Sequence, residues 1–246
     1  MHGEDEHPDL AAIARYLGKS KITPTSPHVR VLAPADRLLL PRAVVLLRLA
    51  RAAEQGRRGA VLNLASHYQV DLRFAARVAD HAQRLFKLLA PVHHLPPEYA
   101  SLLNAAAMLH EAGSFISRAG RRRHALYILA HSDLLGFSLA QRRFIAAIAR
   151  YLSKSKIIPT SLAIRGLTPT DRLLLPRMVL LLRLARAVEQ GRRGAVLSLR
   201  AKIQPRSVYL TLVTRPTGAE LELWALEKER PYFFEVFGRE LSCIEV

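Results

Sequence analysis

Residues 171–199 read DRLLLPRMVLLLRLARAVEQGRRGAVLSL, and residues 36–64 repeat them almost letter for letter as DRLLLPRAVVLLRLARAAEQGRRGAVLNL. The same offset relates ARYLSKSKIIPTS, which begins at Ala149, to ARYLGKSKITPTS, which begins at Ala14. About three quarters of roughly 55 aligned positions are identical, far more than a shared helical pattern would give. The chain therefore contains a sequence duplication, and each copy predicts a helical hairpin.

Two copies of so long a unit do not make a solenoid, which stacks several short repeats. We instead expect a duplicated helical segment at residues 1–64, a helical domain at residues 65–194 and a small α+β domain at residues 195–246. Between the copies, Phe74, Val78 and Leu85 recur at helical spacing, as do Leu102 and Leu109. This pattern predicts two amphipathic helices on either side of the HHLPPE turn region.

The pattern changes after the second copy, because SVYLTLVT and ELELWALE alternate apolar and polar residues. Such alternation predicts half-buried strands of a small antiparallel unit. Pro231 favours the first turn of a short helix through PYFFEVFGREL, and Leu241 and Cys243 begin a last strand. The sequence therefore predicts a mainly α fold with a small C-terminal α+β domain.

The chain has 246 residues, half of them hydrophobic, and a formal net charge of +17. A surface this positive attracts polyanions such as nucleic acid, polyphosphate, nucleotide phosphates or anionic lipid. A coding bias that places Arg on solvated faces is the alternative explanation. Its single cysteine, Cys243, cannot form a disulfide within the chain, which favours a reducing compartment, and we expect the cytoplasm.

The most apolar stretch, LLLPRMVLLLRLA, is interrupted by Pro176, Arg177 and Arg183. It falls short of the roughly 20 apolar residues that a membrane span needs. We therefore expect a buried core helix here and no association with a membrane.

Two basic segments are candidates for anion binding. A helix is expected at residues 138–156, and its wheel places Arg143, Arg150 and Lys154 on the side opposite to the apolar stripe. The second segment follows Gly120 in a loop that leads into a helix, where backbone amides also favour anions. Its cationic residues are Arg121, Arg122, Arg123 and His124. An ordinary solvated face explains either segment as well.

A third feature is the adjacent pair His110 and Glu111 at the end of an apolar helix, with Gly113 as its expected cap. Imidazole and carboxylate suit several divalent ions, but a site needs further ligands, and the nearest candidate is His81. We expect these residues to serve packing rather than metal binding. No glycine-rich phosphate loop of the Walker type appears, and we expect no cofactor.

In these segments the chain resembles the exopolyphosphatase and guanosine pentaphosphate phosphohydrolase family, over about residues 66–246. The resemblance is carried, in order, by AARVADHAQRLF from Ala75, AAAMLHEAG from Ala105, RRRHALYILAHSDLLGFS from Arg121, IARYLSKSK from Ile148, DRLLLPRMVLLLRLA from Asp171 and LELWALEKERPYFFEVFGREL from Leu221. It implies the C-terminal half of such a protein, an HD-like helical bundle followed by a small α+β domain. The family's catalytic machinery, phosphate loops and a catalytic Glu in two preceding actin-like domains, has no counterpart in these residues.

The chain departs from the family at several polar positions. The residues RRRH stand where the family often has a His-His-Lys-His run, and RYLSK from Arg150 stands where it often has Arg-Tyr-His-Arg-Lys. Arg77 replaces the first metal His of the HD type, and Glu111 replaces the Asp of its His-Asp pair. Positive charge persists at the first run, while the second run loses a His and an Arg. The changes at Arg77 and Glu111 weigh against a hydrolytic metal centre.

The resemblance and the charge together predict a region that binds polyphosphate or guanosine polyphosphate, forms a homodimer and performs no hydrolysis by itself. Three alternatives stay open at this point. A nucleic-acid-binding module fits the charge but lacks a recognisable motif. A metal-dependent HD phosphohydrolase would need metal at His110 and Glu111. A rearranged chain without evolved function is suggested by how little the two copies have diverged.

Overall fold

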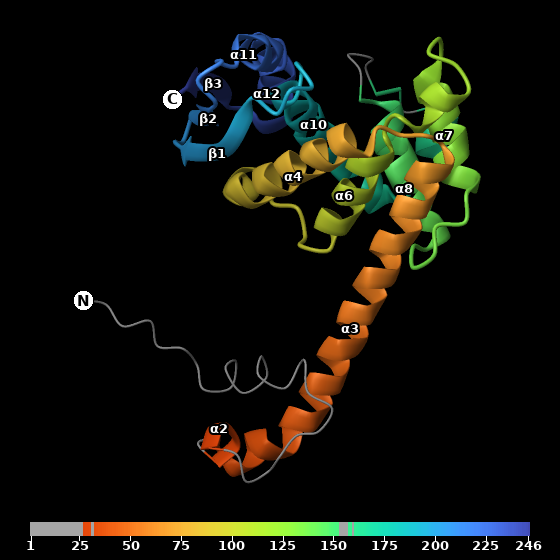
Figure 1. Ribbon diagram of the computed structural model, residues 1–246, viewed down its shortest axis with the longest axis vertical. Coiled ribbons are helices and arrows are strands. Elements are labelled where there is room, and N and C mark those ends of the chain that lie inside the picture. Colours follow the sequence, from red (N-terminus) through yellow and green to blue (C-terminus); the bar gives the residue numbers. More distant parts are fainter. Residues whose placement is uncertain (1–26, 31, 153–156, 159) are drawn as a thin grey trace. The chain divides into compact units, whose positions relative to one another are not determined.

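The computed structural model describes residues 27–30, 32–152, 157–158 and 160–246 (Figure 1). The chain divides into two compact units, Met1–Arg58 and Gly59–Val246. The prediction of a mainly α fold with a small α+β part is confirmed. Within the described residues, no helix is long and apolar enough to cross a membrane.

The second unit begins in the last turns of a long helix and continues through helices to a small sheet. In chain order its elements are the end of α3 (Pro34–His67), α4 (Leu72–Leu88), α5 (Ala90–His93), α6 (Tyr99–Leu109), the 3₁₀ helix η1 (Ala112–Phe115), α7 (Arg121–His131), α8 (Leu139–Arg150), α9 (Leu162–Arg165), α10 (Pro169–Val188), β1 (Val196–Ile203), β2 (Ser207–Thr214), α11 (Glu220–Glu227), α12 (Arg230–Phe237) and β3 (Glu240–Glu245).

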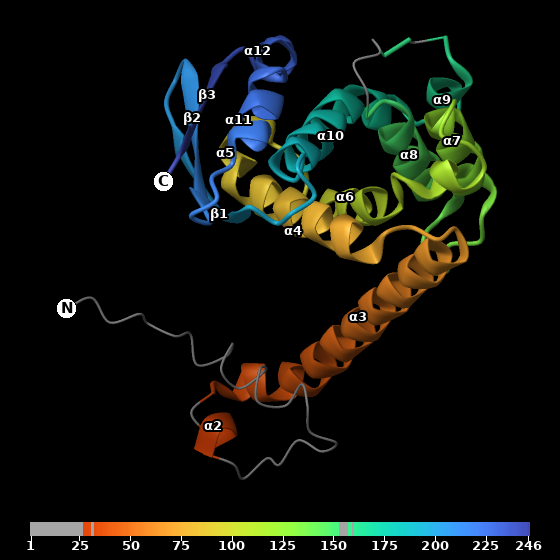
Figure 2. The same ribbon diagram turned by 45° about the horizontal axis from the view of Figure 1, so that its top comes forward.

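Helix α10 is the centre of this unit. Thr168 caps its start by accepting a hydrogen bond from the Asp171 amide at 3.1 Å, and Pro169 occupies the first turn, where a missing N–H costs nothing. The helix contacts α4, α6, α8, α11 and α12, and Figure 2 shows it between the helical part and the sheet part. Most of its residues are buried, so the predicted core helix is confirmed.

The two amphipathic helices predicted between the copies are α4 and α6. Phe74, Val78 and Leu85 form the buried face of α4, as their spacing predicts, and the Asp71 carboxylate caps the helix through the Phe74 amide. Leu102 and Leu109 are buried in α6. The two helices pack on each other and on α10.

The sheet has the order β1-β2-β3, with β1 and β2 antiparallel but β2 and β3 parallel. The expectation of a wholly antiparallel unit is therefore wrong for the last strand. The stretch ELELWALE was expected as a strand and is instead helix α11, because Glu222, Ala225 and Leu226 share one buried helical face. Helices α11 and α12 connect β2 to β3, and both contact β3 and α10 (Figure 2).

The first unit contains α2 (Pro27–Arg30) and α3 up to Arg58. Its buried cluster consists of Val29 and Leu32 before α3, together with Leu40 and Val44 in it. Helix α3 continues as one helix of 34 residues through GRRG. In the second copy, the same letters follow the end of α10 and lead into β1. The first part of the predicted duplicated segment, residues 1–26, lies outside the described residues, so the hairpin stays a prediction.

Helix α8 also ends earlier than predicted, at Arg150 instead of residue 156. Its start is fixed by Ser138 and Gln141, which form a reciprocal capping box. After the helix, the Tyr151 hydroxyl lies 2.6 Å from the Ser161 hydroxyl.

Candidate anion-binding site

The start of α7 is held by close backbone packing against η1. A Cβ atom added to Gly113 would lie 1.8 Å from the carbonyl oxygen of Arg121 and 2.4 Å from the amide nitrogen of Ala125. Only glycine therefore fits at this position. Gly120, the N-cap of α7, adopts φ +77°, a left-handed conformation that glycine adopts at little cost.

These two glycines present the first turn of α7 to a surface pocket. The pocket has a volume of about 350 Å³. Its walls are Arg118, Gly120, Arg121, Arg122, Arg123 and Arg150. Arg150 is the last residue of α8, so the structure brings together the two basic segments that the sequence singled out.

The electrostatics of the pocket are unusual, because the first turn of α7 contains no acidic residue. The N-terminal end of a helix carries partial positive charge, so cations there are unfavourable unless an anion is present. No ion pair joins these five arginines to a carboxylate in the part of the chain that the structure describes. Partial burial, together with Arg121, Arg186 and Arg150, lowers the pKa of Arg122.

Arg186 was not predicted from the sequence. Its pKa is also lowered, chiefly by burial, although the Glu111 carboxylate opposes this effect. Nothing in the sequence pattern distinguishes Arg186 from its repeat counterpart Arg51, which is exposed on α3. The packing of α10 is what places it near Arg122.

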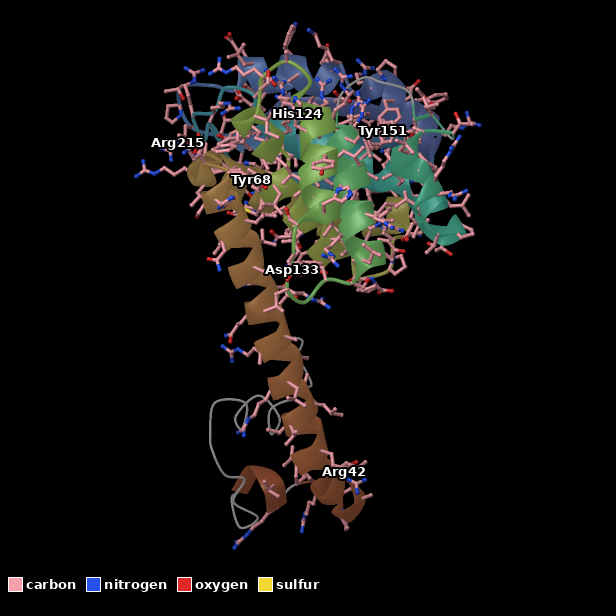
Figure 3. All side chains as sticks on the ribbon, turned by 90° about the vertical axis from the view of Figure 1, so that its right-hand side faces the viewer. Arg42, Tyr68, His124, Asp133, Tyr151 and Arg215 are labelled. Carbon is pink, nitrogen blue, oxygen red and sulfur yellow. The ribbon has the colours of Figure 1, made fainter. Side chains whose placement is uncertain are left out.

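The remaining predicted residues lie elsewhere. Arg143 is exposed and packs beside Gly166, where an added Cβ would lie 3.2 Å from its Cδ, and it does not line the pocket. Lys154 lies outside the described residues. His124 is half-buried in the first turns of α7, next to Gly120 but outside the pocket wall; Figure 3 labels it together with Tyr151. Of the cations predicted along the helix at residues 138–156, Arg143 and Arg150 lie on α8, and only Arg150 lines the pocket.

The weak metal candidates have other partners. Burial lowers the pKa of His110 to about 4, and its Nδ1 lies 2.7 Å from the carbonyl oxygen of Ala107. Glu111 forms an ion pair with Arg192. His81 is buried, with its Nε2 3.7 Å from a carboxylate oxygen of Glu189, and its pKa is lowered by burial.

A metal site at these positions has little support from the described residues. No group of three or more His, Cys, Asp or Glu side chains is close enough there to hold a metal ion. Arg77 pairs with Glu189 at 2.6 Å. Chemically, the arrangement around α7 is suited to binding phosphate groups by several guanidinium forks.

Comparison with known proteins assigns residues 56–230 to the profile described as Ppx/GppA phosphatase, domain III. A guanosine-5'-triphosphate,3'-diphosphate pyrophosphatase from Vibrio vulnificus is 32% identical over 173 residues, which cover 66% of this chain and 33% of that protein. The protein of the same name from Vibrio atlanticus is 29% identical over 180 residues, 69% of this chain and 35% of its own length.

A third similar protein of that name, from Aeromonas salmonicida, is 38% identical over 87 residues, which cover 35% of this chain and 18% of that protein. The chain thus spans about a third of the length of the Vibrio relatives. The matched residues include α4, α7, α8 and α10, which together position the arginine pocket.

Proposed function

The chain belongs to the Ppx/GppA phosphatase family, and we propose that it binds the phosphate chain of inorganic polyphosphate or of a guanosine polyphosphate in the arginine pocket at the start of α7. One observation carries this proposal. Five arginines from two segments meet at a helix N-terminus without a carboxylate partner in the described chain. A polyanion would relieve their mutual repulsion and would accept hydrogen bonds from both guanidinium groups and backbone amides.

The binding energy is expected to be mainly electrostatic. Binding releases counterions from the phosphate chain, and their release is less favourable at high salt, so affinity falls steeply as salt rises. The relatives' name, guanosine-5'-triphosphate,3'-diphosphate pyrophosphatase, is consistent with a ligand that contains several linked phosphates. A nucleic acid would meet the same charge, but its stiff duplex cannot bring consecutive phosphates into one concave pocket as a flexible chain can.

Charge reversal tests the pocket directly. Arg122→Glu combined with Arg150→Glu should weaken binding of polyphosphate of defined length at least about tenfold, because opposite charge then faces the ligand. The matched control is Arg200→Glu combined with Arg206→Glu, two exposed arginines that do not line the pocket. Both double variants change the net charge equally.

Equal losses in the two double variants would show that overall charge, and not the pocket, attracts the ligand. A duplex DNA of equal charge serves as competitor in the same titration. If the DNA displaces polyphosphate at equal concentration of phosphate, the nucleic-acid alternative is favoured instead. Thermal unfolding of both variants checks that the fold is intact.

We expect no release of orthophosphate from polyphosphate or guanosine pentaphosphate by this chain. The arginine pocket offers cations and amides but no paired nucleophile and base, so it can hold the ligand without cleaving it. Phosphate release is measured on highly purified protein. Sustained turnover that a substitution such as Arg122→Glu abolishes would contradict this expectation.

The homodimer remains part of the proposal, through the apolar face of α3. Leu39, Leu46 and Leu49 are 55%, 66% and 62% exposed, although the counterparts of Leu46 and Leu49 in α10, Leu181 and Leu184, are fully buried. Because α3 repeats the sequence of α10, the apolar surface that would fit α3 is the one on which α10 packs. In each chain α10 already occupies that surface. A second chain, exchanging these equivalent segments, would cover the face as in domain swapping.

Light scattering tests this association. Leu46→Glu combined with Leu49→Glu should convert a dimer into a monomer, because two charges would enter the contact. Leu135→Glu combined with Leu162→Glu is the control, since both leucines are more than 70% exposed and lie outside α3. A monomeric wild-type chain would refute the dimer.

The cytoplasm is the proposed location. Burial raises the pKa of the Cys243 thiol to about 12, with Glu227 adding to the effect, so the thiol stays protonated at neutral pH. A protonated and half-buried thiol is a poor nucleophile and does not depend on an oxidising compartment. Fractionation of cells that produce the tagged protein would test the location.

A further inference from the structure

A second pocket, of about 220 Å³, adjoins the arginine pocket, and Arg122 lines both. Its walls come from α7, α10 and α11, and Figure 2 shows α10 and α11 side by side. The residues that matter for its chemistry are Arg122, Arg186, Gln190, Trp224, Lys228 and Glu229. It therefore combines cations, an amide, a carboxylate and one indole ring.

Trp224 is the only tryptophan of the chain, and 55% of its surface is exposed. Helix α11 buries Glu222, Ala225 and Leu226, and Trp224 lies outside this buried set and lines the pocket. A large aromatic side chain left exposed at the edge of a cationic pocket offers a flat surface for stacking. Proteins that bind single-stranded nucleic acid stack bases on such rings, because every base has a π face.

Lys228 currently lies over this ring, with its ammonium nitrogen 3.0 Å from the ring centroid. The lysine is exposed, and a cation above an exposed ring is held only weakly. A planar base can take its place, after which the freed ammonium group is available to a phosphate. The pocket thus already holds a cation where a stacking ligand would sit.

The walls of this second pocket also contain polar groups that can form hydrogen bonds with the edge of a base. Gln190 supplies an amide, which both donates and accepts hydrogen bonds, and Glu229 supplies a carboxylate that also pairs with Arg183 at 2.5 Å. Arg183 is only 8% exposed, and its Nε has no hydrogen-bond acceptor in the described part of the chain. An unpaired donor this deeply buried in a pocket wall is costly unless a ligand or water accepts from it.

We propose that this second pocket is a nucleobase subsite, in which the base of a nucleoside polyphosphate stacks on Trp224 while its phosphates pass Arg122 into the arginine pocket. The proposal rests on the proposed function for the phosphate part alone. A phosphate site alone would not distinguish nucleoside polyphosphates from inorganic polyphosphate. The base subsite would distinguish them, because inorganic polyphosphate would occupy only the arginine pocket. The chain would therefore prefer a nucleoside polyphosphate to a linear phosphate chain of equal length.

The single tryptophan makes the test direct. Guanosine 5'-triphosphate and inorganic tripolyphosphate carry the same phosphate chain and differ by the nucleoside. Saturable quenching of Trp224 fluorescence is expected with guanosine triphosphate, and little change is expected with tripolyphosphate. Calorimetric titration gives the two affinities independently of fluorescence.

Substitutions separate this proposal from the proposed function. Trp224→Leu should weaken guanosine triphosphate about tenfold, as for loss of one stacked base, and leave tripolyphosphate within twofold. Phe234→Leu is the matched control, because Phe234 is 57% exposed on α12 and lines neither pocket. Arg122→Glu combined with Arg150→Glu should weaken both ligands.

The outcomes are distinct. Equal affinity of the wild-type chain for the two ligands, unchanged by Trp224→Leu, would overturn the base subsite and leave the phosphate site standing. Failure of both ligands to bind would overturn the base subsite and the proposed function together. Equal weakening of guanosine triphosphate by Trp224→Leu and Phe234→Leu would also refute a role for the indole.

Discussion

Residues 54–64 and residues 189–199 differ only by Asn63 in the first and Ser198 in the second, yet they fold differently. The first stretch continues helix α3, whereas the second forms a turn after α10 and the beginning of β1. Since the local sequence is nearly the same, local preference cannot be what separates them. The difference teaches that this stretch takes its structure from its surroundings.

The surroundings of the second copy favour a turn and a strand. Glu189 is buried, and one of its carboxylate oxygens accepts hydrogen bonds from the Gly194 amide at 3.0 Å and from Arg77 at 2.6 Å. The Gly191 amide donates to the buried carboxylate of Glu222 at 2.7 Å. Strand β2 then pairs with the residues that follow.

The first copy has no such partners in the described chain. Glu54 pairs instead with Arg57 and Arg58 on the same helix, at 3.9 and 3.7 Å. A Cβ atom added to Gly56 or Gly59 would meet no described atom within 4 Å. Without acceptors or a neighbouring strand, helical hydrogen bonds satisfy the backbone of this stretch.

The beginnings of the two copies, by contrast, fold alike. Arg37 donates from Nε to the carbonyl oxygen of Leu32 at 2.9 Å, and Arg172 makes the same bond to Leu167 at 3.1 Å. The apolar contacts are also equivalent, with Val29, Leu32, Leu40 and Val44 in one copy and Ile164, Leu167, Leu175 and Val179 in the other. This corner is therefore determined locally.

The largest expected difference between the copies comes from the paired glutamates. Glu189→Ala should destabilise the protein by about 3 kcal/mol, because it removes the acceptor of the buried Gly194 amide and of Arg77 Nε. Glu54→Ala should cost less than about 0.5 kcal/mol, since its ion pairs are solvent-exposed. Denaturant unfolding of both variants measures the contrast. Similar losses would mean that residues 54–64 and residues 189–199 share one structure.

Glycine substitutions give the next largest effect, with opposite signs. Gly194 adopts φ +64°, so Gly194→Ala should cost about 1–2 kcal/mol. Gly59→Ala should stabilise α3 by up to about 1 kcal/mol, because alanine is the better helix former and the space is open. Thermal unfolding and helical circular dichroism follow both changes. A destabilising Gly59→Ala would contradict the continuous helix.

Acid should destabilise the second unit through His93, which lies between the two copies and whose carbonyl oxygen accepts a hydrogen bond from Arg177 of α10. The Leu95 amide donates to Nδ1 of His93 at 2.8 Å, while Nε2 lies 2.7 Å from the carbonyl oxygen of Phe86. The ring is therefore neutral and donates from Nε2, and burial lowers its pKa. As the pH falls, the His93 imidazole is protonated in the unfolded chain before it is protonated in the folded chain. Its contribution to the free energy of unfolding is therefore full above about pH 6.5 and decreases as the pH drops below that value.

The lowered pKa of His93 makes the free energy of unfolding depend on pH below about pH 6.5. Unfolding of wild type and His93→Gln across pH 4–8 measures the contribution as a difference in slope. The α3 stretch around Gly59 contains no histidine, so its helicity should not follow the same titration. An identical pH dependence in wild type and His93→Gln would exclude this histidine as the cause.

The smallest effect is expected from exchanging the one residue that differs. Asn63→Ser together with Ser198→Asn should change stability by less than about 0.5 kcal/mol and leave the helix and the strand where they are. The circular dichroism spectrum should be unchanged. A large change in helix content would show that the residue at this one position determines whether the stretch is helical or extended.

By itself, the sequence determined the elements whose hydrophobic pattern fits only one kind of secondary structure. The stripe of Phe74, Val78 and Leu85 predicted α4, the alternation in SVYLTLVT predicted β2, and Pro231 predicted the start region of α12. It also indicated which basic segments to examine, because Arg121, Arg122, Arg123 and Arg150 do meet in one pocket.

Only the tertiary structure decided the rest. ELELWALE satisfies a strand pattern and a helix pattern equally, and the buried face with Glu222 selected the helix. EQGRRGAVL is helical or extended according to whether buried carboxylates and strand β2 are there to receive its amides. Arg186 and Trp224 reach the pockets through the packing of α10 and α11. Such contacts join residues far apart in the chain, and their free energy exceeds the small local preferences that a sequence pattern records.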